Sequence, residues 1–370
     1  MMETSISSKQ EIKNFLLDKK FNKLFVLSGK NSYVKSGAKK FLYPILKNKR
    51  TFLYLKKSYY PEFNELKQII SVVNKFKPNL IIAIGGGSVL DYAKIANVIK
   101  CSSNLKEEIK NSSYQLKTGL AKLLAIPTTA GSGAEVTANA VIYINKKKYS
   151  IEGNLIKPDY FFLIPDFVNK SGNKLKASSG FDAISQSLES LISTKSNNTS
   201  ITFATKSLLY SLKYFIPSLQ KPNVENISKM CLAANLSGKA ISISKTTAPH
   251  AISYPFTAYY GISHGHAVSF TLEKFLKFNF ENINFSKDSF NLKKQFDIIF
   301  NLTKTKNIVE LQSYLKKIKR EANLKDNLVE LGINIKNDYS KIISGVNLQR
   351  LENNPVKIEK KDLKKILISL

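Results

Sequence analysis

The fold is decided by the stretch LIIAIGGGSVLDYAKIANV, residues 80–98. Its first five residues, 80–84, are apolar and predict a strand that is buried on both faces. Three glycines and Ser88 follow, and residues 89–98 have the periodicity of a helix. A strand, a glycine turn and a helix in this order indicate a parallel βαβ unit that binds its ligand at the carboxyl end of the strand.

The same alternation extends over the first 166 residues. Further strands are predicted at 23–28, 51–55, 123–126, 140–144 and 160–163, and helices at 9–22, 33–42 and 62–75, with Pro44 helping to end the second helix. Later residues predict only helices, at 181–194, 201–215, 225–243, 267–279, 306–323 and 361–369. We therefore predict an α/β Rossmann-like N-terminal domain over 1–166 and an all-α C-terminal domain over 167–370.

Polar loops follow two successive strands. At Gly85, Gly86 and Gly87 the absence of Cβ atoms lets backbone N–H groups approach a phosphate, and Ser88 can cap the helix. The second loop, PTTAGSG at 127–133, offers hydroxyl groups for a ribose and a pyrophosphate. Each loop alone is also compatible with a structural turn, but together they predict a dinucleotide site.

The helix after the first loop carries a charged pair. Asp91 and Lys94 are three residues apart and face the same way. The alternative to a functional role is a simple surface ion pair.

All three histidines of the chain, His250, His264 and His266, lie within one short segment. Histidine suits both metal binding and proton transfer near neutral pH. On a predicted helix, Asp182 and Gln186 share a face at i and i+4, although Asp182 is also compatible with a helix N-cap. Together Asp182, His250 and His264 would supply a ligand set for Zn²⁺ or Fe²⁺ with a position left for substrate.

The composition argues for a globular protein without a nucleic-acid partner. The chain has 370 residues and a formal net charge of +30, but nearly all its cations are lysine, with arginine only at 50, 320 and 350. Base readout and bidentate phosphate contacts favour arginine, so a non-catalytic nucleic-acid-binding protein is the weaker alternative. The positive field would instead draw an anionic substrate.

Nothing in the sequence indicates a membrane partner or an export signal. No run of 18 apolar residues is present, and the N-terminal residues lack the apolar segment of a signal peptide. Cys101 and Cys231 offer neither a disulfide framework nor a thiolate metal site. We therefore expect a cytoplasmic protein.

Four motifs together resemble the iron-containing alcohol dehydrogenase family, from about residue 23 to 271. They are GGGSVLDYAK (85–94), IPTTAGSGAEVT (126–137), SGFDAISQSLES (179–190) and PHAISYPFTAYYGISHGHA (249–267). The resemblance implies the dehydroquinate synthase-like fold, a Rossmann-like domain and a helical domain. It also implies an oxidoreductase in which a nicotinamide dinucleotide, NADPH or NADH, meets a divalent metal in the cleft between the domains, and we expect a homodimer.

Carried over onto this chain, the resemblance assigns the metal site to Asp182, Gln186, His250 and His264. The family has a histidine where this chain has Gln186, which leaves the choice between Fe²⁺ and Zn²⁺ open. Another family histidine, linked to proton relay, is replaced by Tyr254. Either Tyr254 or His266 could move the proton.

The resemblance also assigns the cofactor-binding residues. They are Gly85, Gly86, Gly87, Ser88, Asp91, Thr128, Thr129, Ser132, Gly29 and Lys30. Some NAD-preferring members have an aspartate near the end of the first strand, where this chain has Gly29 and Lys30. The loss of that carboxylate removes the repulsion of a 2′-phosphate, which favours NADPH.

Within the family, KTTAPHAISYP followed by HGHA looks most like the branch that reduces phosphonoacetaldehyde to 2-hydroxyethylphosphonate, a step of phosphonate biosynthesis. Lys245, Thr246, Thr247 and His266 would bind the phosphonate. We take His266, Tyr254 and Lys245 as the catalytic set and a small anionic aldehyde as the substrate. The alternatives are a general medium-chain (butanol-type) aldehyde reductase and a metal-dependent cyclase of the dehydroquinate synthase type.

Overall fold

A computed structural model describes residues 5–18, 20–286, 290–346 and 348–370. The chain divides into two compact units. Unit 1 comprises Met1–Gly172 and Asn223–Asn235, and unit 2 comprises Asn173–Pro222 and Leu236–Leu370. The predicted combination of an α/β part and an all-helical part is confirmed.

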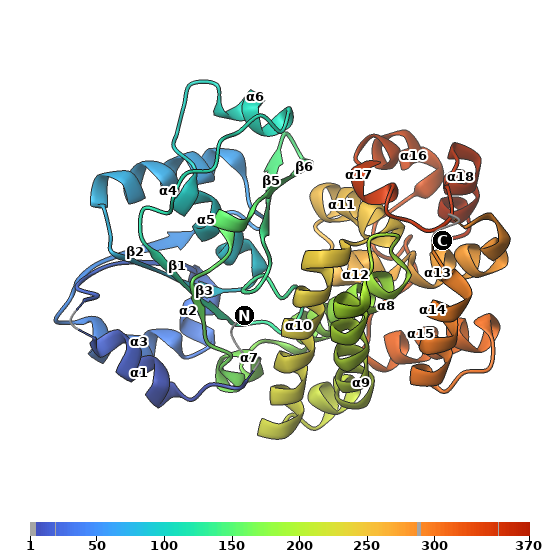
Figure 1. The fold of residues 1–370 in the computed structure, drawn as a ribbon, viewed down its shortest axis with the longest axis horizontal. Coiled ribbons are helices and arrows are strands. Elements are labelled where there is room, and N and C mark those ends of the chain that lie inside the picture. The colour runs from blue at the N-terminus through green and yellow to red at the C-terminus, as the bar shows by residue number, and fades with distance from the viewer. Residues whose placement is uncertain (1–4, 19, 287–289, 347) are drawn as a thin grey trace. The chain divides into compact units, whose positions relative to one another are not determined.

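Unit 1 is built on a five-stranded parallel sheet of order β2-β1-β3-β4-β7 (Figure 1). Its strands are β1 (Lys23–Gly29), β2 (Arg50–Lys56), β3 (Leu80–Gly85), β4 (Lys122–Pro127) and β7 (Tyr160–Phe161). The helices are α1 (Lys9–Leu17), α2 (Lys30–Lys35), α3 (Ala38–Leu46), α4 (Phe63–Phe76), α5 (Gly87–Val98), α6 (Leu105–Lys110) and α7 (Pro165–Asn169), with the short 3₁₀ helix η1 (Asn154–Ile156). The strand order changes direction between β1 and β3, which is where ligands bind in open α/β sheets.

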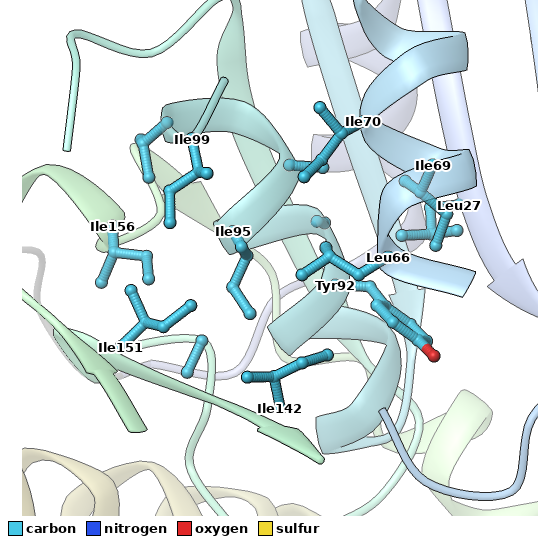
Figure 2. Close-up of a cluster of buried hydrophobic side chains, with 14 of the residues drawn as sticks. Leu27, Leu66, Ile69, Ile70, Tyr92, Ile95, Ile99, Ile142, Ile151 and Ile156 are labelled. Atoms are coloured by element: carbon cyan, nitrogen blue, oxygen red, sulfur yellow. The ribbon is translucent and has the colours of Figure 1, made fainter. Parts of the chain in front are cut away.

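The side chains of each strand alternate between the two faces of the sheet, and helices cover both faces. Ile81 and Ala83 of β3 pack under α4 and α5, while Ile82 and Ile84 pack on the other face with α1, α3 and α7. Figure 2 shows the first of these cores, where Ile95 of α5 points toward Ile142 and Ile151, while the Tyr92 hydroxyl points away from them. Each fully buried large apolar side chain contributes about 1.5–3 kcal/mol to folding.

Two of the predictions for unit 1 were wrong. The single helix at 33–42 is two helices, α2 and α3, separated at Gly37, whose φ of +81° ends the helical path. Pro44 lies inside α3 and does not end it. The strand predicted at 140–144 is confirmed as β5 (Asn139–Ile144), and it pairs antiparallel with β6 (Lys147–Glu152) outside the main sheet.

The hairpin of β5 and β6 was missed because its turn lacks glycine. Asn145 and Lys146 form the two-residue turn with φ of 51° and 64°. These angles are those of a type I′ turn, which usually contains glycine. The lysine-rich β6 also has no clear apolar alternation.

Unit 2 is helical. Its helices are α8 (Asn173–Ile192), α9 (Asn198–Gln220), the second half of α10 (Val224–Ser244), α11 (Ala248–Tyr260), α12 (His264–Ser269), α13 (Leu272–Glu281), α14 (Leu292–Thr303), α15 (Ile308–Glu321), α16 (Ile335–Ser344), α17 (Leu348–Leu351) and α18 (Lys360–Ile368), with the 3₁₀ helix η2 (Ile283–Phe285). No helix was predicted at α11, α14, α16 or α17, and the single helix predicted at 267–279 joins the end of α12 to α13. In α11 the pattern is obscured by prolines at 249 and 255 and by burial on nearly every side.

Over the described part of the chain, we find no helix with both the length and the apolar character needed to cross a membrane.

Candidate metal centre

Three side chains predicted as metal ligands come together in unit 2. Asp182 projects from α8, His250 from α11 and His264 from the first position of α12. One ligand atom from each lies within 4.8 Å of the others. Asp182 Oδ1 is 3.3 Å from His250 Nε2 and 3.9 Å from His264 Nε2. Asp182 and His250 are buried, while 35% of the His264 side chain is exposed.

Gly265 allows this convergence. The residue follows His264 on α12, which packs against α8. A Cβ atom at Gly265 would lie 2.0 Å from the carbonyl oxygen of Ser178 and 2.7 Å from Asp182 Cβ. Any larger residue would therefore push α12, and His264 with it, away from the carboxylate.

Glu189 orients His250. Its fully buried carboxylate hydrogen bonds through Oε1 with His250 Nδ1, and its Oε2 accepts hydrogen bonds from the backbone N–H of Thr247 at 2.8 Å and from the Thr247 hydroxyl at 3.0 Å. A carboxylate on the far nitrogen fixes the ring orientation and makes the imidazole a better ligand. Glu189 was not among the predicted site residues, although its position seven residues after Asp182, on the same face of α8, was a usable signal.

The electrostatics of the cluster fit a cation. His250 Nε2 is buried without a hydrogen bond and faces Asp182 Oδ1. Because Nδ1 is bonded to Glu189, the Nε2 lone pair would face the negatively charged carboxylate oxygen. A proton or a metal ion between these two atoms removes that repulsion. Burial lowers the pKa of His250, but the carboxylates of Glu189 and Asp182 outweigh it and raise the pKa to about 9. One carboxylate and two imidazoles are a donor set suited to Zn²⁺ or Fe²⁺.

Gln186, the fourth residue expected at the metal, is engaged by two neighbours. Its Nε2 donates to Asp182 Oδ2 over 3.2 Å, and its Oε1 accepts a hydrogen bond from Ser237 Oγ over 2.9 Å.

The candidate proton donors lie in different surroundings. The ring of Tyr254 stacks on His264 with centroids 5.7 Å apart, and burial raises the pKa of Tyr254 above its usual value of 10. His266 Nε2 instead hydrogen bonds with the carbonyl oxygen of Lys325 at 2.7 Å, and its ring packs on Phe270. Tyr254 therefore lies at the metal group, whereas the His266 ring is held by Lys325.

The segment before α11 has a fixed geometry. Lys245 has a φ of 61°, an uncommon conformation for a residue other than glycine. The carbonyl oxygen of Thr246 accepts a hydrogen bond from the buried Asn353 side chain. Thr247, expected to bind an anion, gives its hydroxyl and backbone N–H to Glu189.

In unit 1 the predicted nucleotide loops lie at the ends of adjacent strands. Thr128 N donates to Gly85 O over 2.9 Å, and a Cβ atom at Gly87 would lie 3.0 Å from Ser132 Oγ. A Cβ atom at Gly86 would likewise contact the Thr129 side chain at 3.5 Å.

The start of α5 has no hydrogen bond from an N-cap side chain. Its N-cap is Gly86, and no side chain caps the helix, so Ser88 is not the cap that the sequence suggested. N–H groups at a helix N-terminus favour a bound anion.

The end of β1 borders the same edge of the sheet. Ser28 Oγ donates to Ile84 O over 2.6 Å, which ties β1 to β3. Gly29 is the last residue of β1, and Lys30 is exposed at the start of α2.

Lys94 is a structural cation of the segment 134–139, which follows the second loop. It is fully buried, and its ammonium group donates to the carbonyl oxygens of Ala134 and Asn139 and to the Thr137 hydroxyl at 2.6–2.8 Å. The reading of Asp91 and Lys94 as a surface ion pair is therefore wrong. Burial raises the pKa of the partly exposed Asp91 and lowers that of Lys94, and each charge opposes the effect of burial on the other.

Comparisons with known proteins agree with this arrangement. The family model "Iron-containing alcohol dehydrogenase" matches residues 6–165, and the model "Fe-containing alcohol dehydrogenase family, C-terminal" matches residues 176–370. A phosphonoacetaldehyde reductase from Streptomyces viridochromogenes is 30% identical over 213 residues, which are 55% of this chain and 54% of the relative. An NADPH-dependent butanol dehydrogenase from Clostridium saccharobutylicum is 27% identical over 310 residues, 80% of this chain and 77% of the relative.

Solved structures share the fold. A sulfoacetaldehyde reductase from Bifidobacterium kashiwanohense, solved with NAD+, superimposes with a TM-score of 0.86 at 23% identity, covering 99% of this chain and 95% of that one. The chain spans about half the length of the first curated relatives that it matches, 54% and 56%. The two family models nevertheless cover both units, and the chain therefore belongs to the iron-containing alcohol dehydrogenase family.

Proposed function

We propose that the protein catalyses the metal-dependent, NAD(P)H-linked reduction of an aldehyde to a primary alcohol. The observation that carries this proposal is the convergence of Asp182, His250 and His264, with one ligand atom of each within 4.8 Å of the others. When bound, a nicotinamide dinucleotide supplies the hydride, and a divalent metal polarises the carbonyl group and stabilises the alkoxide.

The chain's own residues hold and orient the reacting groups. Asp182, His250 and His264 bind the metal, and Glu189 fixes the His250 ring. Tyr254 is the proton donor that we favour, because its ring stacks on His264 and a phenol carries its proton near neutral pH. His266 is the second candidate, and its proton would have to leave the bond to Lys325.

The loops of unit 1 would bind the dinucleotide. Gly85, Gly86, Gly87 and Ser88 receive the pyrophosphate at the start of α5, with Thr128, Thr129, Ser132 and Asp91 beside it. Gly29 at the end of β1 and Lys30 at the start of α2 favour NADPH over NADH, since a lysine attracts a 2′-phosphate. The relative described as an NADPH-dependent butanol dehydrogenase supports the same choice.

We further propose that the substrate is a small anionic aldehyde, with phosphonoacetaldehyde first. One relative is a phosphonoacetaldehyde reductase, and the chain carries a net charge of +30. Lys245 immediately precedes the Thr246–Thr247 pair that leads into the His250 helix, and its ammonium group would bind the phosphonate. The second candidate is a butanol-type reductase, which the butanol dehydrogenase relative favours.

Two measurements test this proposal on the purified protein. Metal analysis should find Fe²⁺ or Zn²⁺, and NADPH oxidation should be faster with phosphonoacetaldehyde than with butanal. Equal rates of NADPH oxidation with the two aldehydes would contradict the proposed anionic substrate but not the proposed reductase activity. No net consumption of NADPH with any aldehyde would favour a cyclase.

The variant His264→Ala separates the two halves of the mechanism. Turnover should fall by about a thousandfold or more, because the metal loses a ligand. Dinucleotide binding, measured by fluorescence of the bound NADPH, should stay nearly unchanged. A loss of both together would contradict the assigned role of His264.

A further inference from the structure

The amide of Gln186 is oriented by its neighbours. Its nitrogen faces the Asp182 carboxylate and its oxygen faces the Ser237 hydroxyl, and all three side chains are buried. Turning the amide over would place its oxygen against a carboxylate oxygen and remove a charge-assisted hydrogen bond. The neighbours therefore determine which end of the amide faces Asp182.

This orientation is wrong for metal binding. A glutamine binds a cation through its amide oxygen, because the nitrogen lone pair is delocalised into the carbonyl group. In Gln186 that oxygen is bonded to Ser237 on α10, and the end that faces Asp182 carries hydrogen atoms. Coordination would require both hydrogen bonds to break inside a buried cluster.

We propose that Gln186 is a positioning residue for Asp182, and that the protein holds its metal through Asp182, His250 and His264 alone. Gln186 ties Asp182 Oδ2, which leaves Oδ1 as the oxygen that faces the imidazoles at 3.3 and 3.9 Å. The carboxylate is thus held to bind through one oxygen. Three protein ligands leave a coordination position for the oxygen of an aldehyde. Gln186 has this role only if the metal-dependent function proposed above holds.

The variant Ser237→Ala distinguishes Gln186 as a positioning residue from Gln186 as a metal ligand, because the two roles predict opposite changes in Zn²⁺ affinity. If Gln186 positions Asp182, loss of the Ser237 hydroxyl loosens the amide and weakens Zn²⁺ binding by about tenfold. If Gln186 is a ligand, the same variant releases its oxygen toward the ion, and affinity stays the same or rises. An unchanged or higher affinity in Ser237→Ala would overturn the proposal.

A second variant acts on Gln186 directly. Gln186→Met keeps the side-chain volume but removes both polar atoms, and should weaken Zn²⁺ binding roughly tenfold or more. The visible absorption spectrum of the Co²⁺-loaded variant should match that of the wild type, since the ligand set is the same. A changed spectrum at saturating Co²⁺ would show that a ligand was lost and would refute the role. In Gln186→Met combined with Ser237→Ala, affinity should fall no further than in Gln186→Met alone.

The affinities are measured on the full chain by competition with a chromogenic chelator, which needs no turnover. Ser207→Ala is the matched control, because Ser207 is a buried serine bonded to Ser187 of α8, and should leave Zn²⁺ affinity unchanged. Melting of the metal-free variants shows that the fold is kept. If the wild type binds neither Zn²⁺ nor Fe²⁺, the proposed function itself fails. If the wild type binds metal and Ser237→Ala leaves Zn²⁺ affinity unchanged or raises it, only the proposed role of Gln186 fails.

Discussion

The nucleotide loops of unit 1 and the metal cluster of unit 2 are built in opposite ways. The loops are short, rich in glycine, serine and threonine, and follow β1, β3 and β4, whose ends must meet because the strands are parallel neighbours. The metal cluster joins side chains from three helices, and the chain between Asp182 and His264 has no local pattern that brings them together. The nucleotide loops thus owe their position to the strands before them, whereas a site between helices depends on a few close side-chain contacts.

The largest effect is expected from Gly265→Ala. The added Cβ atom would lie 2.0 Å from the Ser178 carbonyl oxygen, so α12 must move away from α8. We expect a loss of about 3 kcal/mol in unfolding free energy and a loss of Zn²⁺ affinity of roughly a hundredfold or more. Chemical denaturation and chelator competition measure the two. Gly172→Ala is the control, because its Cβ atom would meet nothing within 4 Å. Wild-type metal affinity in Gly265→Ala would contradict the close-contact account.

Lys94→Met should cost about 3 kcal/mol of unfolding free energy, because it leaves three oxygen acceptors without their cation. The loop at 134–139 should loosen and NADPH affinity should fall. Urea denaturation measures the stability, and Lys100→Met, at an exposed lysine, should change it little. Equal stability of the two variants would show that the Lys94 bonds contribute nothing.

Glu189→Gln should weaken Zn²⁺ binding by roughly 10–100-fold, because the amide keeps the shape but lacks the charge that strengthens His250 as a ligand. NADPH affinity should remain unchanged, since the change lies in unit 2. Zn²⁺ affinity and NADPH affinity are both measured on Glu189→Gln and compared with those of the wild type. Wild-type Zn²⁺ affinity would mean that Glu189 only fills space.

The smallest effect is expected from Gly87→Ala. The new Cβ atom would lie 3.0 Å from Ser132 Oγ, which can give way, but it would also screen the N–H groups at the start of α5. We expect NADPH affinity to fall about tenfold, with metal affinity unchanged. Isothermal titration calorimetry on the metal-loaded protein checks this. If NADPH affinity in Gly87→Ala fell much more than Zn²⁺ affinity falls in Glu189→Gln, the nucleotide loops would be the more sensitive of the two sites.

The sequence predicted the sheet of unit 1 better than the helices of unit 2. Continuous apolar runs such as residues 80–84 leave little choice but a buried parallel strand. The helix α11 was missed, because prolines and burial on nearly all sides remove its amphipathic pattern. Gly37 shows the same limit in unit 1, since its positive φ is a property of the folded chain.

Residue types alone indicated Asp182, His250 and His264 as a metal group, because the chain gathers its whole supply of imidazole into one segment. They also indicated the glycine loop at 85–88, because that loop sits between a strand and a helix. Only the tertiary structure showed that Glu189 holds His250, that Lys94 is buried, and that the Gln186 oxygen faces Ser237. The physical reason is that a short motif fixes which atoms are available, whereas packing between distant elements decides the direction in which each atom points.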